Sequence, residues 1–167
     1  MGSMTMIPPK QSGDVLIDEY GEQQPLPQLS LLVGIQLGVL FFLARVAGIR
    51  RYPAIRIGDL LLLAIGTHKL SRIVAKDRVT APVRAPFTRF KERSGSGEVE
   101  EEARGAGLQG VIGELISCPY CMSVWIASGL LLLFIVDQKL ARLVCKWLAM
   151  ITASHFLHRF YVRLEPQ

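Results

Sequence analysis

A run of fifteen uncharged residues, Met122 to Val136, directly follows a Cys-Pro-Tyr-Cys motif and constrains the fold more than any other part of the chain. Buried helices of soluble proteins rarely run this long without polar residues. Three further apolar segments have a similar length, and each is close to the roughly 20 residues that a helix needs to cross a bilayer. The pattern predicts an all-α, polytopic integral membrane protein with four transmembrane helices. We place them at residues 29–49, 55–76, 111–137 (with the Cys-Pro-Tyr-Cys turn at its entry) and 139–162.

The segments outside these helices are polar. Residues 1–28 are proline-rich and net acidic, which predicts a disordered tail, and they lack the apolar core of a cleavable signal. Residues 77–110 form a hydrophilic connection. Its first half alternates basic residues with phenylalanines, which suits a membrane surface, and its second half is rich in Gly, Ser and Glu. We expect a flexible loop there, with the Glu98–Glu102 cluster as a solvated run.

Composition narrows the class of function. Three cysteines in 167 residues are too few for a secreted disulfide scaffold. The formal charge of +5 fits lipid headgroups and membrane topology better than nucleic acid, so we expect no nucleic-acid partner. The chain contains no phosphate loop, nucleophile elbow or His-Glu-x-x-His motif, which favours a structural or regulatory role over catalysis. The expected partners are the lipid bilayer and either a second copy or another membrane protein.

The distribution of basic residues predicts the orientation. Four crossings place both termini and the long connection on one side of the membrane. Twelve of the nineteen Lys and Arg residues fall on that side and seven on the other. The positive-inside rule therefore places both termini in the cytoplasm, with the protein in the bacterial cell membrane.

The same topology brings cysteines and histidines to one membrane face. His68 lies near the end of the second helix, Cys118 and Cys121 begin the third, and His155 and His158 lie near the end of the fourth. Two thiolates and two imidazoles suit a tetrahedral zinc ion, so we predict a metal site with Cys118, Cys121, His68 and either His155 or His158 as ligands. Three further side chains would support it from the helix faces: Arg72, Glu114 and Arg159.

Two alternatives to the zinc site remain open. Cys-Pro-Tyr-Cys is also the active-site tetrapeptide of glutaredoxins, so Cys118 and Cys121 could form a membrane thiol–disulfide oxidoreductase, although no β-α-β pattern surrounds them. The third reading is a lipid- or partner-binding adaptor that uses the basic connection. Its contact residues would be Arg84, Phe87, Arg89 and Phe90.

The order of short motifs resembles a bacterial membrane family of unknown function, the YngL-like family. The likeness covers roughly residues 57–161. Along it come an apolar helix ending in His-x-x-x-Arg, a basic loop with Pro-x-Arg, then Gly113-Glu114-Leu115 and Cys-Pro-x-Cys-x-x-x-Trp. This resemblance implies a small polytopic membrane protein and no established activity. It also implies that the first helix and the acidic tail are additions to a common core.

Overall fold

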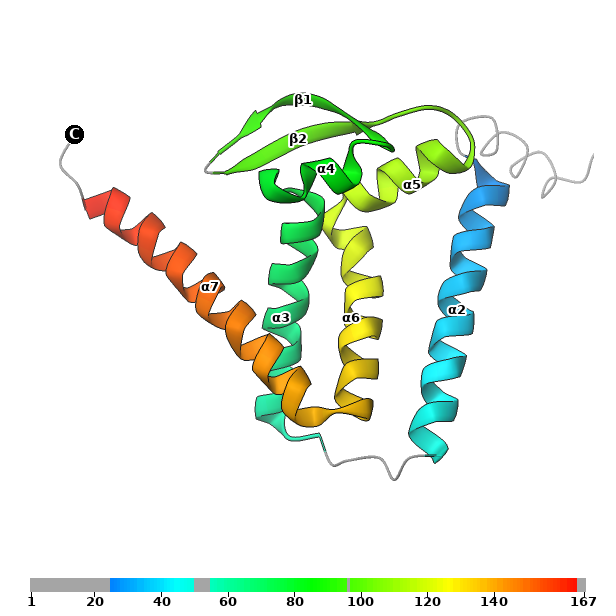
Figure 1. The fold of residues 1–167 in the computed structure, drawn as a ribbon, viewed down its shortest axis with the longest axis vertical. Helices are drawn as coiled ribbons and strands as arrows, with labels where there is room; N and C mark the ends of the chain where they lie inside the picture. Colours follow the sequence, from blue (N-terminus) through cyan, green and yellow to red (C-terminus); the bar gives the residue numbers. More distant parts are fainter. Residues whose placement is uncertain (1–24, 50–54, 96, 165–167) are drawn as a thin grey trace, which may run out of the picture.

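The structure is a computed structural model, and it describes residues 25–49, 55–95 and 97–164 (Figure 1). Four long helices make up most of the fold. Short helices and a pair of strands, which lie between the second and third long helices in the sequence, cover one end. Residues 1–24 of the tail predicted at residues 1–28 lie outside the described residues, and so do residues 50–54. In chain order the elements are α2 (Leu26–Ile49), α3 (Ile57–Ala75), η1 (Arg78–Thr80), α4 (Ala81–Arg84), β1 (Thr88–Ser94), β2 (Glu98–Ala103), α5 (Leu108–Ser117), α6 (Pro119–Val136) and α7 (Gln138–Leu164).

Three of these helices are long and apolar enough to cross a membrane. They are α2, α6 and α7, judged over the described residues. The second predicted span, α3, has the required length in its 19 residues, but it also carries Asp59, Lys69 and Arg72. Four spans were predicted and three helices are apolar enough to cross a membrane. The difference is α3, which is long enough but carries three charges.

The prediction of an all-α fold is wrong in the long connection. Strands β1 and β2 pair antiparallel there, with an irregular register between Phe90 and Glu92. The turn between the strands uses Gly95 and Gly97, both in the left-handed region of backbone space that favours glycine. We call η1, α4, β1, β2 and α5 together the cap. It lies across the same end of α3 and α6 (Figure 1).

Ion pairs explain why the acidic run is a strand rather than a solvated loop. Glu98 binds Arg72 at 2.6 Å, Glu100 binds Lys76 at 2.7 Å, and Glu101 binds Arg84 at 2.8 Å. Arg84 is only 1% exposed, and the Glu101 side chain is 5% exposed. The acidic strand is therefore fixed to the end of α3 and to α4 by complementary charge.

Helix α7 packs beside α3 along a seam that changes character halfway. Its buried residues, Ala141, Cys145 and Leu148, recur every three or four positions, as the inward face of a helix does. Gly66 of α3 permits this approach, because a Cβ there would lie 2.9 Å from the Cys145 sulfur. The next two positions in the series are polar, Thr152 and His155. From residue 153 to residue 164 every side chain of α7 is exposed, and the helix diverges from the bundle (Figure 1).

Local chemistry sets the two breaks around α6. Cys118 is extended (φ −103°, ψ 109°) and Pro119 follows at the first helical position, which ends α5 and starts α6. At the other end, Asp137 alone separates α6 from α7. Its carboxylate accepts the backbone N–H groups of Lys139 and Leu140 at 2.9 and 3.0 Å, as a helix N-cap does.

Candidate functional site

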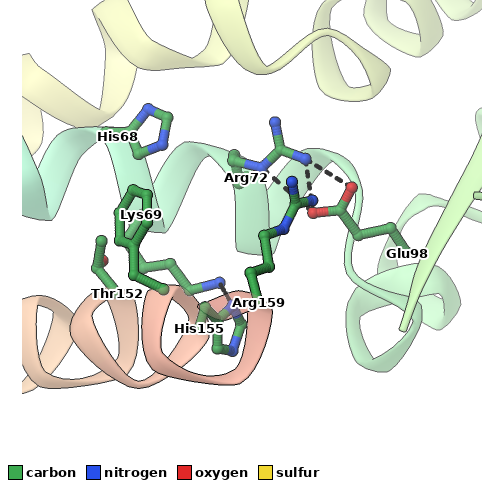
Figure 2. Close-up of a pocket in the computed structure, with 8 residues that line it drawn as sticks. His68, Lys69, Arg72, Glu98, Thr152, His155 and Arg159 are labelled. Carbon is green, nitrogen blue, oxygen red and sulfur yellow. Dashed lines mark hydrogen bonds and ion pairs between the residues drawn. The ribbon is translucent and has the colours of Figure 1, made fainter. Parts of the chain in front are cut away.

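A basic cleft opens where α7 leaves α3, beneath strand β2 (Figure 2). It has a volume of about 240 Å³. Three elements line it: α3, β2 and α7. The lining residues are His68, Lys69, Arg72, Glu98, Thr152, His155, Phe156 and Arg159. Three cationic side chains and two imidazoles thus face a single carboxylate.

Lys69 is the most deeply buried charged residue in this cleft. The residue is only 4% exposed. Its amine lies 3.3 Å from Nδ1 of His155, to which it can donate when that nitrogen is unprotonated. Among the described residues the closest carboxylate is that of Asp77, and the two are 4.0 Å apart, beyond hydrogen-bonding distance. A buried ammonium without a carboxylate in hydrogen-bonding contact is costly, and such groups mark functional sites more often than packing sites.

Arg72 is partly neutralised and partly free. Its Nε and Nη2 atoms donate to Glu98 at distances between 2.6 and 3.2 Å. Within the described part of the chain, Nη1 has no hydrogen-bond partner. Arg159 extends from α7 toward the Arg72–Glu98 pair (Figure 2). Arg72, Arg159 and Glu114 were predicted to support the metal site. Arg72 and Arg159 both line this cleft, whereas Glu114 lies exposed on α5 and does not line it.

The cysteine pair lies at the α5–α6 junction, outside this cleft. Cys118 is the N-cap of α6, and its Sγ accepts the backbone N–H of Cys121 at 3.4 Å. Burial raises the pKa of the Cys118 thiol, but hydrogen bonds from the Cys121 side chain and backbone outweigh burial and lower that pKa. Cys118, Cys121 and the buried Cys145 are all free thiols. A thiol at a helix N-terminus is a candidate nucleophile, because a lowered pKa increases the fraction present as thiolate.

The four predicted zinc ligands are not gathered at one point. His68 and His155 line the basic cleft, while Cys118 and Cys121 lie at the start of α6. His158 lines a separate hollow that is formed by residues of α7 alone. Over residues 25–49, 55–95 and 97–164, no group of three or more His, Cys, Asp or Glu side chains is placed to hold a metal ion. The zinc site stays a prediction that this geometry does not support.

The predicted lipid-binding residues of the connection divide into two sets. Arg84 is buried and cannot touch a lipid or a partner, so its assignment to that surface is wrong. Phe87 is half-buried next to it. Arg89 and Phe90 are exposed on β1, where a contact with headgroups or with a partner remains open to them.

Sequence reasoning missed Lys69 and Glu98 as site residues. Lys69 was passed over between His68, which was predicted to be a zinc ligand, and Arg72, which was predicted to support the zinc site. The signal that could have found it is its position: a lysine one turn closer to the helix centre than Arg72 has a long way to reach water. Glu98 could not be found locally, because its partner lies 26 residues earlier.

Comparison with known proteins finds a family whose role is not known. Residues 62–161 match a family described as a protein of unknown function (DUF1360). The chain is 33% identical over 97 residues to "Sporulation protein YjcA" of Bacillus subtilis (strain 168), which covers 56% of this chain and 79% of that protein. No solved structure matches. The matches confirm an uncharacterised bacterial family but not the YngL-like family that the motifs resemble, and α2 lies outside the residues that match the family.

Proposed function

The chain belongs to the DUF1360 family, whose function is unknown, and we propose that it is a small multi-pass membrane protein that binds a phosphate-bearing anion in the cleft between α3 and α7. One observation carries the proposal. The Lys69 ammonium is buried in a cleft that also holds Arg72 and Arg159, and the cleft contains one carboxylate. An anion bound there would neutralise the excess positive charge and accept hydrogen bonds from the N–H groups that lack a partner.

In this proposal α3 is the fourth membrane crossing. Each of its charges has a partner that lowers the cost of burial. Asp59 accepts two hydrogen bonds from Arg142, at 2.7 and 2.9 Å, and Arg72 binds Glu98. Lys69 would be completed by the ligand. The start of α2, the cap and the end of α7 lie at one end of the helices (Figure 1). The excess of basic residues at that end supports a cytoplasmic location for the cap and both termini.

The Bacillus subtilis relative is named a sporulation protein, so we propose that this membrane protein acts in sporulation. Basic pockets between transmembrane helices on the cytoplasmic side are a common way to bind phosphate headgroups. The proposal therefore places the cleft at the membrane surface. There, the ligand could be either a lipid headgroup or a soluble phosphate ester.

Lys69→Met should separate a binding role from a structural one. Binding of glycerol phosphate to the detergent-purified protein at low salt should weaken about tenfold to a hundredfold, because hydrogen bonds to charged groups contribute about 1.5–3 kcal/mol. The free energy of unfolding without ligand should rise, because a buried charge with no carboxylate in hydrogen-bonding contact is removed. Titration calorimetry and denaturant melts measure the two effects.

Lys146→Met is the matched control, because Lys146 is exposed on the same helix that forms the far wall of the cleft. This variant should bind glycerol phosphate like the unmodified protein. If Lys69→Met and Lys146→Met bind equally well, the cleft is not an anion site. If Lys69→Met loses stability instead of gaining it, Lys69 is a structural residue.

A second candidate function is thiol–disulfide exchange, which the N-cap position of Cys118 favours. The Cys118 thiolate would attack a partner disulfide and displace one thiolate, and Cys121 would then displace the other. Two electrons pass to the partner, and a dithiol reductant would restore the pair. Cys121→Ser should trap a mixed disulfide, and Cys118→Ser should abolish reaction with a disulfide substrate. Equal activity in Cys118→Ser and the unmodified protein would exclude this role.

A further inference from the structure

We propose that the anion of the basic cleft is the headgroup of a membrane phospholipid, and that one acyl chain of this lipid lies in a groove between α3 and α6. The inference rests on the proposed function, because it names the class of ligand that the cleft would take. The groove is a second cavity, of about 530 Å³, and it shares His68 and Arg72 with the cleft.

Small side chains open this groove. Ala64, Thr67 and Ser71 of α3 face Ser123 and Ala127 of α6, and each is too short to fill the space between the two helices. The α6 positions recur at helical spacing, from Tyr120 to Leu131. At 1.5 Å per residue this stripe is about 16 Å long. A groove of these proportions is narrow and extended, as an acyl chain is.

The groove is polar at one end and apolar at the other. Near the cap it is lined by His68, Arg72 and the exposed Tyr120, and toward the membrane centre by Leu63 and Leu131. In Figure 2 the His68 ring and the outer end of Arg72 point toward α6, away from α7. Glu98 occupies Nε and Nη2 of Arg72, so the remaining nitrogen, Nη1, is directed to this side.

The charge pattern selects an anionic amphiphile as the occupant. Arg72 and His68 stand between the two cavities, so a phosphate near them would also be within the field of Lys69 and Arg159. In a bilayer, an open groove between two helices must be filled by something apolar, and lipid chains surround it on the outside. Affinity for the lipid would thus come from two parts, the headgroup in the field of these cations and the acyl chain buried in the groove.

The test compares two substitutions that add the same side chain to α6. Ala127→Leu fills the groove, whereas Gly129→Leu points into open space, because nothing lies within 4 Å of a Cβ at Gly129. Full-length protein is purified in a mild detergent, stripped of lipid and titrated with phosphatidylglycerol. Native mass spectrometry counts the bound lipid. We expect Ala127→Leu to weaken lipid binding at least tenfold and to leave glycerol phosphate binding unchanged. Gly129→Leu should have no effect on either.

The outcomes separate this inference from the proposed function. If Ala127→Leu retains the lipid while Lys69→Met loses both ligands, the cleft binds anions but the groove holds no chain, and the inference is overturned. Equal affinity of the unmodified protein for glycerol phosphate and phosphatidylglycerol has the same meaning. If Lys69→Met loses neither ligand, the proposed function itself fails. Ala64→Leu, on the opposite wall, repeats the test should Ala127→Leu fail to fold.

Discussion

Replacement of Glu101 by Gln is expected to open the cap, at a cost of about 3–5 kcal/mol in its local stability. The substitution keeps the shape of the side chain and removes its charge. Arg84 then stays buried at 1% exposure without a counterion. Breaking one member of a buried ion pair is destabilising mainly because of the uncompensated charge that remains.

The cost is large because Arg84 is the hub of the cap. Its Nε and Nη2 donate to the two carboxylate oxygens of Glu101 at 2.8 and 3.0 Å. Its Nη1 donates to the Val74 carbonyl at the end of α3 and to the Thr80 hydroxyl, both at 2.6 Å. Helix ends leave carbonyl groups without partners, and this guanidinium satisfies one of them while it holds β2. Loss of the pair therefore loosens α3, α4 and the hairpin together.

Hydrogen exchange of the β2 amides measures the opening directly. A loss of 3–5 kcal/mol corresponds to exchange that is roughly two to four powers of ten faster. Glu102→Gln is the matched control, because Glu102 is the next residue of the same strand and is exposed. Exposed substitutions of this kind usually change stability by less than about 0.5 kcal/mol. Equal exchange in the two variants would show that the buried pair does not hold the cap.

The same pair determines how the cap responds to acid. Burial raises the pKa of Glu101, but hydrogen bonds from Arg84 and Thr88 outweigh it, so the pKa lies below the ordinary value. A depressed carboxyl pKa stabilises the folded state above the unfolded pKa, near 4.3, and this stability is lost as pH falls through the folded value. Pepsin cleavage of the hairpin should therefore stay slow at pH 5 and accelerate below about pH 4. In Glu101→Gln it should be fast throughout.

The long helices could be predicted from sequence because they depend on local patterns. A run such as Leu60–Leu63 is apolar wherever it packs, and the break at Cys118–Pro119 follows from the missing N–H and fixed φ of proline. The polar residues 137–139 between two apolar segments likewise indicate a short turn, because two membrane-spanning helices joined so closely must fold back on each other. These features need no knowledge of distant partners.

The cap could not be predicted in the same way. Its strand β2, Glu98–Ala103, has four glutamates in six residues and no clear apolar alternation, so it is typical of a solvated loop. What makes it a strand is pairing with Arg72, Lys76 and Arg84, which lie 17 to 26 residues earlier. Alternation then places Val99 and Glu101 on the buried face. Charge complementarity across such separations is not encoded in any local period.

The candidate site was predicted in part. His68, Arg72, His155 and Arg159 do meet at one face, because two helices that end on the same side bring their last turns together. The zinc site predicted from them is not supported by where the cysteines lie. Sequence spacing placed Cys118 and Cys121 with the histidines, but the start of α6 holds the thiols apart from the α3–α7 seam. The order of the membrane crossings predicts how deep a residue lies in the membrane. Which neighbouring helix its side chain contacts depends on helix packing, which the order of crossings does not give.

The second large effect is expected at Gly113, in the Gly113-Glu114-Leu115 motif. Gly113 is buried where α5 lies against the hairpin. A Cβ at this position would collide with the Phe87 carbonyl oxygen and would lie 3.1 Å from the Cα and Cβ of Ala103. Two of these atoms are backbone and cannot rotate away, so Gly113→Ala must push α5 off β2. The glycine is required by close packing rather than by its backbone angles.

Gly113→Ala should lower the free energy of unfolding by up to about 2 kcal/mol. Overpacking typically costs about 1–3 kcal/mol, with a collision against backbone atoms at the upper end, and alanine offsets about 1 kcal/mol of this because it is favoured over glycine inside a helix. Gly129→Ala isolates that gain, because a Cβ at Gly129 meets nothing within 4 Å. The same substitution should thus destabilise the protein in α5 and stabilise it in α6. Denaturant melts of the two variants in detergent give both signs, and hydrogen exchange should place the Gly113→Ala loss in the hairpin. A stabilising effect at both positions would mean that α5 is not packed against the cap in this way.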